Sequence, residues 1–148
     1  ENKKWNELII LIMDKHPNIK VKLIGTESEL PFLEDIKTGL NSNVEIVVLN
    51  NFEQSFSILV NSEITFTVCN GTSHLAAISG TKTISIYGPT NPNKTGVFGE
   101  ESVRVFNKKI ECGPCYKLGY IQGCGKPVCM TDISAEEIFV FMNNTKWL

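Results

Sequence analysis

Two short apolar runs joined by a helical segment constrain the fold of this chain most strongly. Ile64–Val68 and Thr83–Tyr87 are rich in β-branched residues, which predicts two buried strands. Between them the pattern breaks at Asn70 and Gly71 and becomes helical over Ser73–Ser79. A strand, a helix and a second strand of these lengths form a βαβ unit, in which the two strands run parallel.

The same alternation of strand and helix continues over most of the 148 residues. Further strands are expected at Val21–Ile24, Val44–Leu49 and Val103–Phe106, and further helices at Trp5–Met13, Leu30–Leu40, Phe52–Val60 and from Ser134 onwards. The last helix should begin with a capping box, because Glu137 follows Ser134 by three residues. The alternation predicts an α/β fold with a doubly wound, Rossmann-like parallel sheet in a single domain, residues 1–148, that includes an irregular Cys-rich segment at residues 107–131.

Composition and charge narrow the functional classes. Hydrophobic residues make up 42% of the chain and charged residues 20%, as in globular domains. The formal net charge of −2 argues against nucleic acid as a partner, and no apolar run approaches the roughly 20 residues of a transmembrane helix. An odd number of cysteines and the lack of a visible signal peptide favour a reducing, cytoplasmic setting. Because the first residue is Glu1 and not Met, we expect the chain to be an excised domain.

In doubly wound folds, ligands bind outside the carboxyl ends of the strands. The loops after Gly25, Val68 and Tyr87 are therefore the places where a site is expected. The loop after Val68 is the most informative, because Asn70–His74 combines a glycine, small polar residues and a histidine at the start of a helix. The N-terminus of a helix attracts anions, so this segment predicts a phosphate site.

Each residue of this segment has an expected role. Gly71 lets the backbone turn and lets a ligand approach closely, since it has no Cβ. The amides of Thr72, Ser73 and His74 are expected to face the anion, and Thr72 or Ser73 is expected to cap the helix. The imidazole of His74 should face the carboxyl edge of the sheet and add a hydrogen bond to the phosphate.

A purely structural interpretation of the segment, a capped helix with a half-buried histidine, accounts for the spacing equally well. In either case Leu75 and Ile78 are expected to form the buried face of the helix. The dinucleotide fingerprint Gly-x-Gly-x-x-Gly is absent, which argues against a dehydrogenase.

Residues 69–92, CNGTSHLAAISGTKTISIYGPTNP, resemble the hallmark of the heptosyltransferase family, glycosyltransferase family 9. That family carries Asp-Ser/Thr-Gly-x-x-His-Leu-Ala-Ala, a short spacer and a strand that ends in Gly-Pro-Thr-Asp-Pro. The resemblance extends to Lys3-Lys4-Trp5, which is similar to the family's Lys-x-Trp, and to LIGTESE at residues 23–29. The chain therefore resembles the C-terminal, donor-binding half of a GT-B enzyme.

The resemblance implies an enzyme that transfers a heptose-like sugar from an ADP-sugar to a lipopolysaccharide-type glycolipid at the inner face of the membrane. It implies a metal-independent reaction that requires no cofactor. The donor-binding residues that it implies are Lys3 on the phosphates, Glu29 on the ribose, and Asn70, Gly71, Thr72, Ser73 and His74 around the diphosphate. The family's general base and its acceptor-binding domain belong to the N-terminal half, so no catalytic residue is assigned in this chain.

Two positions depart from the family pattern. Cys69 stands where the family has Asp, and Asn70 stands where it has Ser or Thr. A thiol and a neutral amide thus replace a carboxylate that would contact the donor. The alternative function is a non-catalytic α/β module that binds a nucleotide or another protein.

Four cysteines, Cys112, Cys115, Cys124 and Cys129, fall within the Cys-rich segment. The Cys-x-x-Cys pair and the two later cysteines could form a tetrahedral zinc site, disulfides or a group of free thiols. The wide spacing of the second pair disfavours zinc, and the resemblance includes a comparable cysteine segment that points to a structural role. Cys69 lies outside this segment and is expected to be a small apolar residue at a strand end.

Overall fold

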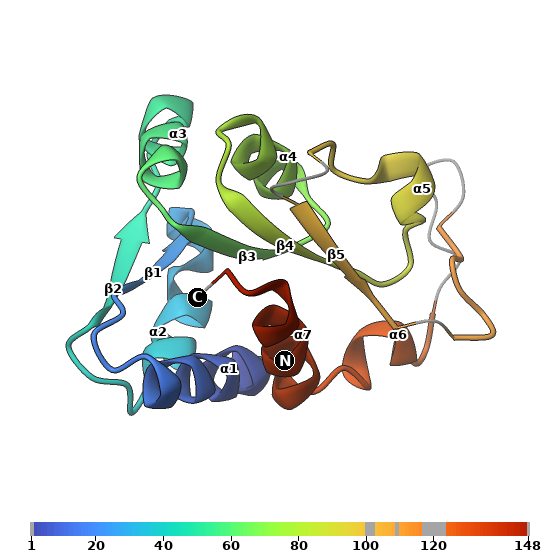
Figure 1. Cartoon of the computed structure of the whole chain (residues 1–148), viewed down its shortest axis with the longest axis horizontal. Helices are drawn as coiled ribbons and strands as arrows, with labels where there is room; N and C mark the ends of the chain where they lie inside the picture. Colours follow the sequence, from blue (N-terminus) through green and yellow to red (C-terminus); the bar gives the residue numbers. More distant parts are fainter. Residues whose placement is uncertain (1, 100–102, 109, 117–123, 148) are drawn as a thin grey trace. The chain divides into compact units, whose positions relative to one another are not determined.

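The computed structural model describes residues 2–99, 103–108, 110–116 and 124–147 (Figure 1). The chain forms two compact units, which we describe separately. Unit 1 consists of residues 1–55 and 134–140, and unit 2 consists of residues 56–133 and 141–148. Residues 109 and 117–123 of the predicted Cys-rich segment lie outside the described residues.

Unit 1 is a parallel strand pair with two helices. Its elements are α1 (Asn2–Lys15), β1 (Val21–Gly25), the 3-10 helix η1 (Glu27–Glu29), α2 (Leu30–Lys37) and β2 (Val44–Val48). The strands pair in parallel from Val21 opposite Val44 to Gly25 opposite Val48. The core contains one apolar face of α1 and residues of α2 and β2, namely Ile9, Met13, Ile36 and Val44. Trp5 and Val21 pack against this core.

Unit 2 contains the βαβ unit predicted from the sequence. Its elements are β3 (Ile64–Val68), α4 (Gly71–Ile78), β4 (Lys82–Tyr87), α5 (Pro92–Thr95), β5 (Val103–Asn107) and α6 (Val128–Thr131). The three strands are parallel, in the order β3-β4-β5 (Figure 1). The helices α3 (Phe52–Val60) and α7 (Ala135–Thr145) contribute residues to both units.

The central strand of unit 2, β4, is buried along nearly its whole length. Thr83, Ile84, Ser85 and Tyr87 are each 0% exposed. Burial on both faces is typical of a central strand in a parallel sheet, because helices cover both sides. One of these helices is α4, which packs against β3 and β4. Packing on β4 therefore fixes the position of its carboxyl end, from which the next loop begins.

The α/β class with parallel strands, predicted from the sequence, is confirmed. The four strands and four helices predicted before β5 begin or end within a few residues of their expected limits, as does β5. The predicted capping box of α7 is present, since Ser134 Oγ accepts from the Glu137 amide at 3.1 Å and Glu137 Oε2 accepts from the Ser134 amide at 2.8 Å. Three short helices, η1, α5 and α6, were not predicted, and the strands form one pair and one three-stranded sheet.

Candidate functional site

The first turn of α4, directly beyond β3, is stabilised by a capping box between Asn70 and Ser73. The Asn70 side chain accepts a hydrogen bond from the Ser73 amide at 3.2 Å, and Ser73 Oγ accepts one from the Asn70 amide at 3.4 Å. Thr67 Oγ1 donates to Asn70 Oδ1 at 3.3 Å and so fixes its direction. This capping box makes Asn70 the cap, with its backbone extended. The prediction that Thr72 or Ser73 caps the helix is wrong, because the dihedral angles put Ser73 in the third helical position.

The capping box also decides which amides remain for a ligand. A helix start has four N–H groups without an intrahelical partner, and here the box uses those of Asn70 and Ser73. The amide of His74 is the first that can donate within the helix, to the carbonyl of Asn70. The expected amide set of Thr72, Ser73 and His74 is thus corrected to Gly71 and Thr72, whose N–H groups have no partner among the described residues.

Removal of the Asn70 side chain should destabilise unit 2. Asn70→Ala loses the cap of α4 and leaves the amide of the fully buried Ser73 unpaired. We expect a loss of about 1 kcal/mol in the free energy of unfolding, measured by urea denaturation. Asn70→Ser is the matched control, because serine can still accept from the third helical amide and should retain most of the stability. An Asn70→Ala variant as stable as the wild type would show that the cap contributes nothing.

Open space lies beside Gly71. A Cβ placed on this residue would meet no atom within 4 Å, and the residue is exposed. The glycine is therefore not needed for packing inside the unit. Its missing side chain instead leaves the amides of Gly71 and Thr72 uncovered toward the outside, where an anion could reach them.

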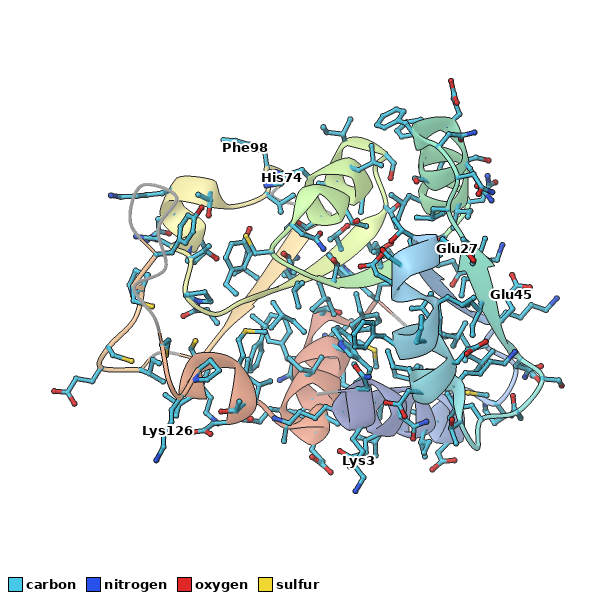
Figure 2. The ribbon with its side chains drawn as sticks, turned by 180° about the vertical axis from the view of Figure 1, so that it is seen from behind. Lys3, Glu27, Glu45, His74, Phe98 and Lys126 are labelled. Atoms are coloured by element: carbon cyan, nitrogen blue, oxygen red, sulfur yellow. The ribbon has the colours of Figure 1, made fainter. Side chains whose placement is uncertain are left out.

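The exposed face of α4 carries His74 (Figure 2). Ile78, one turn further on, is 79% exposed, whereas Ser73 and Ala76 are 0% exposed and form the buried face. The expectation that Leu75 and Ile78 form the buried face is wrong for Ile78, and Leu75 is half-buried. Small buried residues allow α4 to pack closely on the strands, which leaves the larger side chains on the outer side.

The hydroxyl of Tyr87 links two loops at the carboxyl edge of unit 2. Tyr87 is fully buried, and its hydroxyl donates to the carbonyl of Thr95 at 3.2 Å. Burial and the neighbouring Cys69 thiol raise the pKa of Tyr87, while a hydrogen bond from the Val97 backbone opposes this shift. Cys69 precedes the cap of α4, and its amide donates to Ile86 at 2.9 Å. The loop after β3 and the loop after α5 therefore meet at one buried phenol.

The loop after β4 contacts the cysteine segment. The amide of Tyr116 donates to the carbonyl of Pro89 at 2.9 Å. A Cβ on Gly88 would lie 2.5 Å from Met130 Sδ and 3.3 Å from Cys129 Sγ, so α6 packs directly on this turn. The Cys-rich segment therefore packs against the loop Gly88-Pro89-Thr90.

The five cysteines are free thiols in the structure. Cys129 is buried, and burial, followed by the charges of Cys115, Cys124 and Cys112, raises the pKa of its thiol. The described residues contain no group of three or more His, Cys, Asp or Glu side chains that could hold a metal ion.

In unit 1, Glu29 lies over the carboxyl end of β1. Its Oε2 accepts hydrogen bonds from the amide and the hydroxyl of Thr26, both at 2.8 Å. A Cβ on Gly25 would lie 3.1 Å from the same oxygen, so the glycine makes room for the carboxylate. The hydrogen bonds from the Thr26 backbone and side chain lower the pKa of Glu29, which keeps the carboxylate ionised at neutral pH. Oε1 remains for a ligand.

The contribution of Glu29 to stability should depend on pH. Because the pKa is lower in the folded state, the ionised carboxylate stabilises unit 1 above its ordinary pKa of about 4.3 and loses this effect as the pH falls through the folded value. Glu29→Gln should therefore be less stable than the wild type at pH 7, and the difference should shrink below about pH 4.3. Thermal melts of both proteins across this range measure it. A difference that stays constant with pH would contradict the assignment.

Lys3 lies at the other end of the strand pair. It is exposed in the first turn of α1, next to Asn2, whose side chain donates to Asp35 at 2.9 Å near the end of α2. Trp5 packs against the core that contains Val44, the first residue of β2. Glu29 lies at the carboxyl end of β1. The phosphate contact of Lys3 stays a prediction.

A parallel α/β sheet with a glycine at the start of a capped helix, beyond the carboxyl end of a strand, is typical of proteins that bind phosphorylated ligands. A family model assigns the particular class. The chain belongs to glycosyltransferase family 9 (heptosyltransferase), whose model matches residues 1–124.

Individual relatives agree with this assignment. Lipopolysaccharide heptosyltransferase 1 of Pseudomonas aeruginosa is 26% identical over 113 residues, which is 76% of this chain and 31% of the relative. A structure of an E. coli heptosyltransferase with ADP has 24% identity and a TM-score of 0.74, and covers 98% of this chain and 39% of that one. A structure with ADP-2-deoxy-2-fluoro heptose has 23% identity and a TM-score of 0.72, over 97% and 38%. The chain therefore spans about a third of the length of that curated relative.

Among the predicted donor residues, Asn70, Gly71, Thr72, Ser73 and His74 lie together in unit 2, and Lys3 and Glu29 lie in unit 1. The sequence predicted Tyr87 as a strand residue within the family motif but did not indicate that its hydroxyl connects two loops. The tyrosine at the end of an apolar strand was the available signal, because a buried hydroxyl requires a partner.

Proposed function

We propose that this chain is the donor-binding part of a glycosyltransferase that transfers a heptose-like sugar from an ADP-sugar to a lipopolysaccharide-type acceptor. The observation that carries the proposal is the start of α4, where the amides of Gly71 and Thr72 stand uncovered beside an exposed His74. A nucleoside diphosphate is an anion of the right chemistry for such a site. The similar E. coli heptosyltransferase structures with ADP and with ADP-2-deoxy-2-fluoro heptose support an ADP-sugar as the donor class.

In the proposed reaction, a hydroxyl oxygen of the acceptor attacks the anomeric carbon of the donor. A new carbon–oxygen bond forms, the bond from that carbon to the diphosphate oxygen breaks, and ADP leaves with its electron pair. Negative charge grows on the diphosphate as it leaves, so the two amides and the imidazole of His74 stabilise the transition state. These groups take the place of a divalent cation. The proton acceptor is expected in the acceptor-binding part of the enzyme.

The nucleoside end of the donor is assigned to unit 1. Glu29 Oε1 would accept hydrogen bonds from the ribose hydroxyls, as carboxylates do at the carboxyl edge of dinucleotide-binding sheets. Its Oε2 is held by Thr26, which orients the free oxygen. The contact of Lys3 with the phosphates belongs to the same proposal and rests on the family resemblance alone.

The proposed acceptor is a glycolipid, which places the reaction at the inner face of a membrane. No helix among the described residues is long and apolar enough to cross a bilayer. We propose that the enzyme meets its acceptor as a peripheral protein on the cytoplasmic side.

A non-catalytic α/β binding module is the second candidate. It is favoured by Cys69, which stands where the family carries an aspartate and whose thiol faces the buried Tyr87 hydroxyl. A thiol in that position supplies no carboxylate for a donor.

Calorimetric titration with ADP and with ADP-linked heptose, together with a transfer assay on the protein that contains this chain, separates the two candidates. Binding of both ligands and sugar transfer to a lipopolysaccharide acceptor are the results expected of the transferase. Binding without transfer would support the module. A folded protein that binds neither ligand would overturn the proposed donor site.

A further inference from the structure

Phe98 is the most exposed large hydrophobic side chain among the described residues. It is 92% exposed, compared with 66% for Phe52 and 58% for Phe32. Full burial of a phenylalanine contributes about 1.5–3 kcal/mol, so an uncovered ring leaves this free energy available to a ligand. A single exposed apolar residue requires no explanation by itself. Its position is what gives Phe98 a role.

The loop that carries Phe98 is held on both sides. Before it, the side chain of Asn91 accepts from the Asn93 amide at 2.9 Å and caps α5, and the hydroxyl of Tyr87 donates to Thr95 at 3.2 Å. After it, the carbonyl of Gly99 accepts from the Val103 amide at 2.8 Å, which joins the loop to β5. The ring is thus presented by an anchored segment.

The same loop borders the start of α4. The backbone of Val97 and the thiol of Cys69 both interact with the Tyr87 hydroxyl. Phe98 follows Val97 directly, and Gly71 follows Cys69 by two residues. Figure 2 shows the labelled Phe98 and His74 at the same side of unit 2. The loop that carries Phe98 and the loop that leads to the amides proposed to hold the diphosphate therefore meet at Tyr87.

We propose that the ring of Phe98 packs against the sugar of the nucleotide-sugar and so distinguishes the sugar-linked donor from ADP. This inference rests on the proposed function. The diphosphate of such a donor carries a nucleoside at one end and a sugar at the other, and Phe98 is assigned to the sugar end.

The chemistry suits a sugar ring. One face of a pyranose presents C–H groups, which carry weak positive charge and little hydrogen-bonding capacity. An aromatic face is negative, so it attracts these C–H groups and removes apolar area from water at the same time. Phe98 has no polar atom of its own and would add no bond to the hydroxyl groups of the sugar. The phenyl ring would lie flat against the C–H face of the sugar.

The test compares the affinities of ADP and of the non-transferable donor analogue ADP-2-deoxy-2-fluoro heptose by calorimetry. Phe98→Ala should weaken the analogue about five- to tenfold, the scale of an aromatic contact, and leave the ADP affinity within about twofold. Phe98→Tyr retains the ring and should retain the analogue affinity. Ile78→Ala, which removes another highly exposed apolar side chain of unit 2, is the control and should change neither affinity.

The melting temperature of Phe98→Ala should equal that of the wild type, because the ring has no buried packing. Equal loss of ADP and analogue affinity in Phe98→Ala would overturn the proposal by placing the ring on the nucleotide. Unchanged affinity for both would overturn it by placing the ring outside the donor site. A wild-type protein that binds neither ligand would instead refute the proposed function on which the inference depends.

Discussion

Gly71→Val should abolish most of the affinity for ADP and leave the fold intact. A valine side chain would project into the open space beside Gly71, where a Cβ meets no atom within 4 Å apart from the adjacent residues and the backbone of α4, and should cover the amides of Gly71 and Thr72. Each hydrogen bond to a charged group contributes about 1.5–3 kcal/mol, so the loss of both should weaken ADP at least about a hundredfold. Calorimetric titration of the variant measures this loss.

Gly125→Val is the matched control for this substitution. A Cβ on Gly125 also meets no atom within 4 Å, and the residue follows Cys124, outside the start of α4. Both variants should melt within a few degrees of the wild type, and only Gly71→Val should lose ADP. Unchanged ADP affinity in Gly71→Val would show that the diphosphate does not approach the helix at this point.

His74→Ala should weaken ADP binding by about 1–3 kcal/mol, which is roughly a five- to 150-fold increase in Kd. The substitution removes an imidazole that can donate to the charged diphosphate. His74 is exposed on α4, while the buried contacts of this helix come from Ser73 and Ala76, so stability should hardly change. Titration with ADP and a thermal melt of the same sample give the two quantities.

His74→Gln is the informative companion, because its side-chain amide can still donate a hydrogen bond without an imidazole. Its affinity for ADP should lie between those of the wild type and His74→Ala. If His74→Ala instead lowers the melting temperature strongly and binds ADP as the wild type does, the histidine has a structural role.

The βαβ unit around Gly71 could be predicted because its signals are local. Ile64–Val68 has the same limits in the structure as in the sequence pattern, and Asn70 and Gly71 mark the turn in both. The cap could not be predicted, because Asn70, Thr72 and Ser73 are all residues that cap helices. Which of them does so depends on backbone angles that tertiary packing imposes.

The outer face of α4 could not be predicted for a different reason. Ile78 is apolar, so its pattern predicted burial, but an eight-residue helix that packs through Ser73 and Ala76 has no room for it underneath. The phosphate contact expected of Lys3 rests on a short motif and stays a prediction, whereas the position of α1 follows from contacts of Trp5 with residues far along the chain. The short helix α5 could not be predicted from hydrophobic periodicity, because it has only four residues. Its only sequence signal is Asn91-Pro92, a helix cap followed by proline at the first helical position.

Two hydrogen bonds from Thr26 fix the carboxylate of Glu29 before any ligand arrives. A free glutamate side chain loses about 1.5–2 kcal/mol of rotamer entropy when it is immobilised. In this protein much of that rotamer entropy is already lost on folding. A ribose hydroxyl that donates to Oε1 would therefore bind with a smaller entropy cost. The small 3-10 turn thus preorganises a binding group.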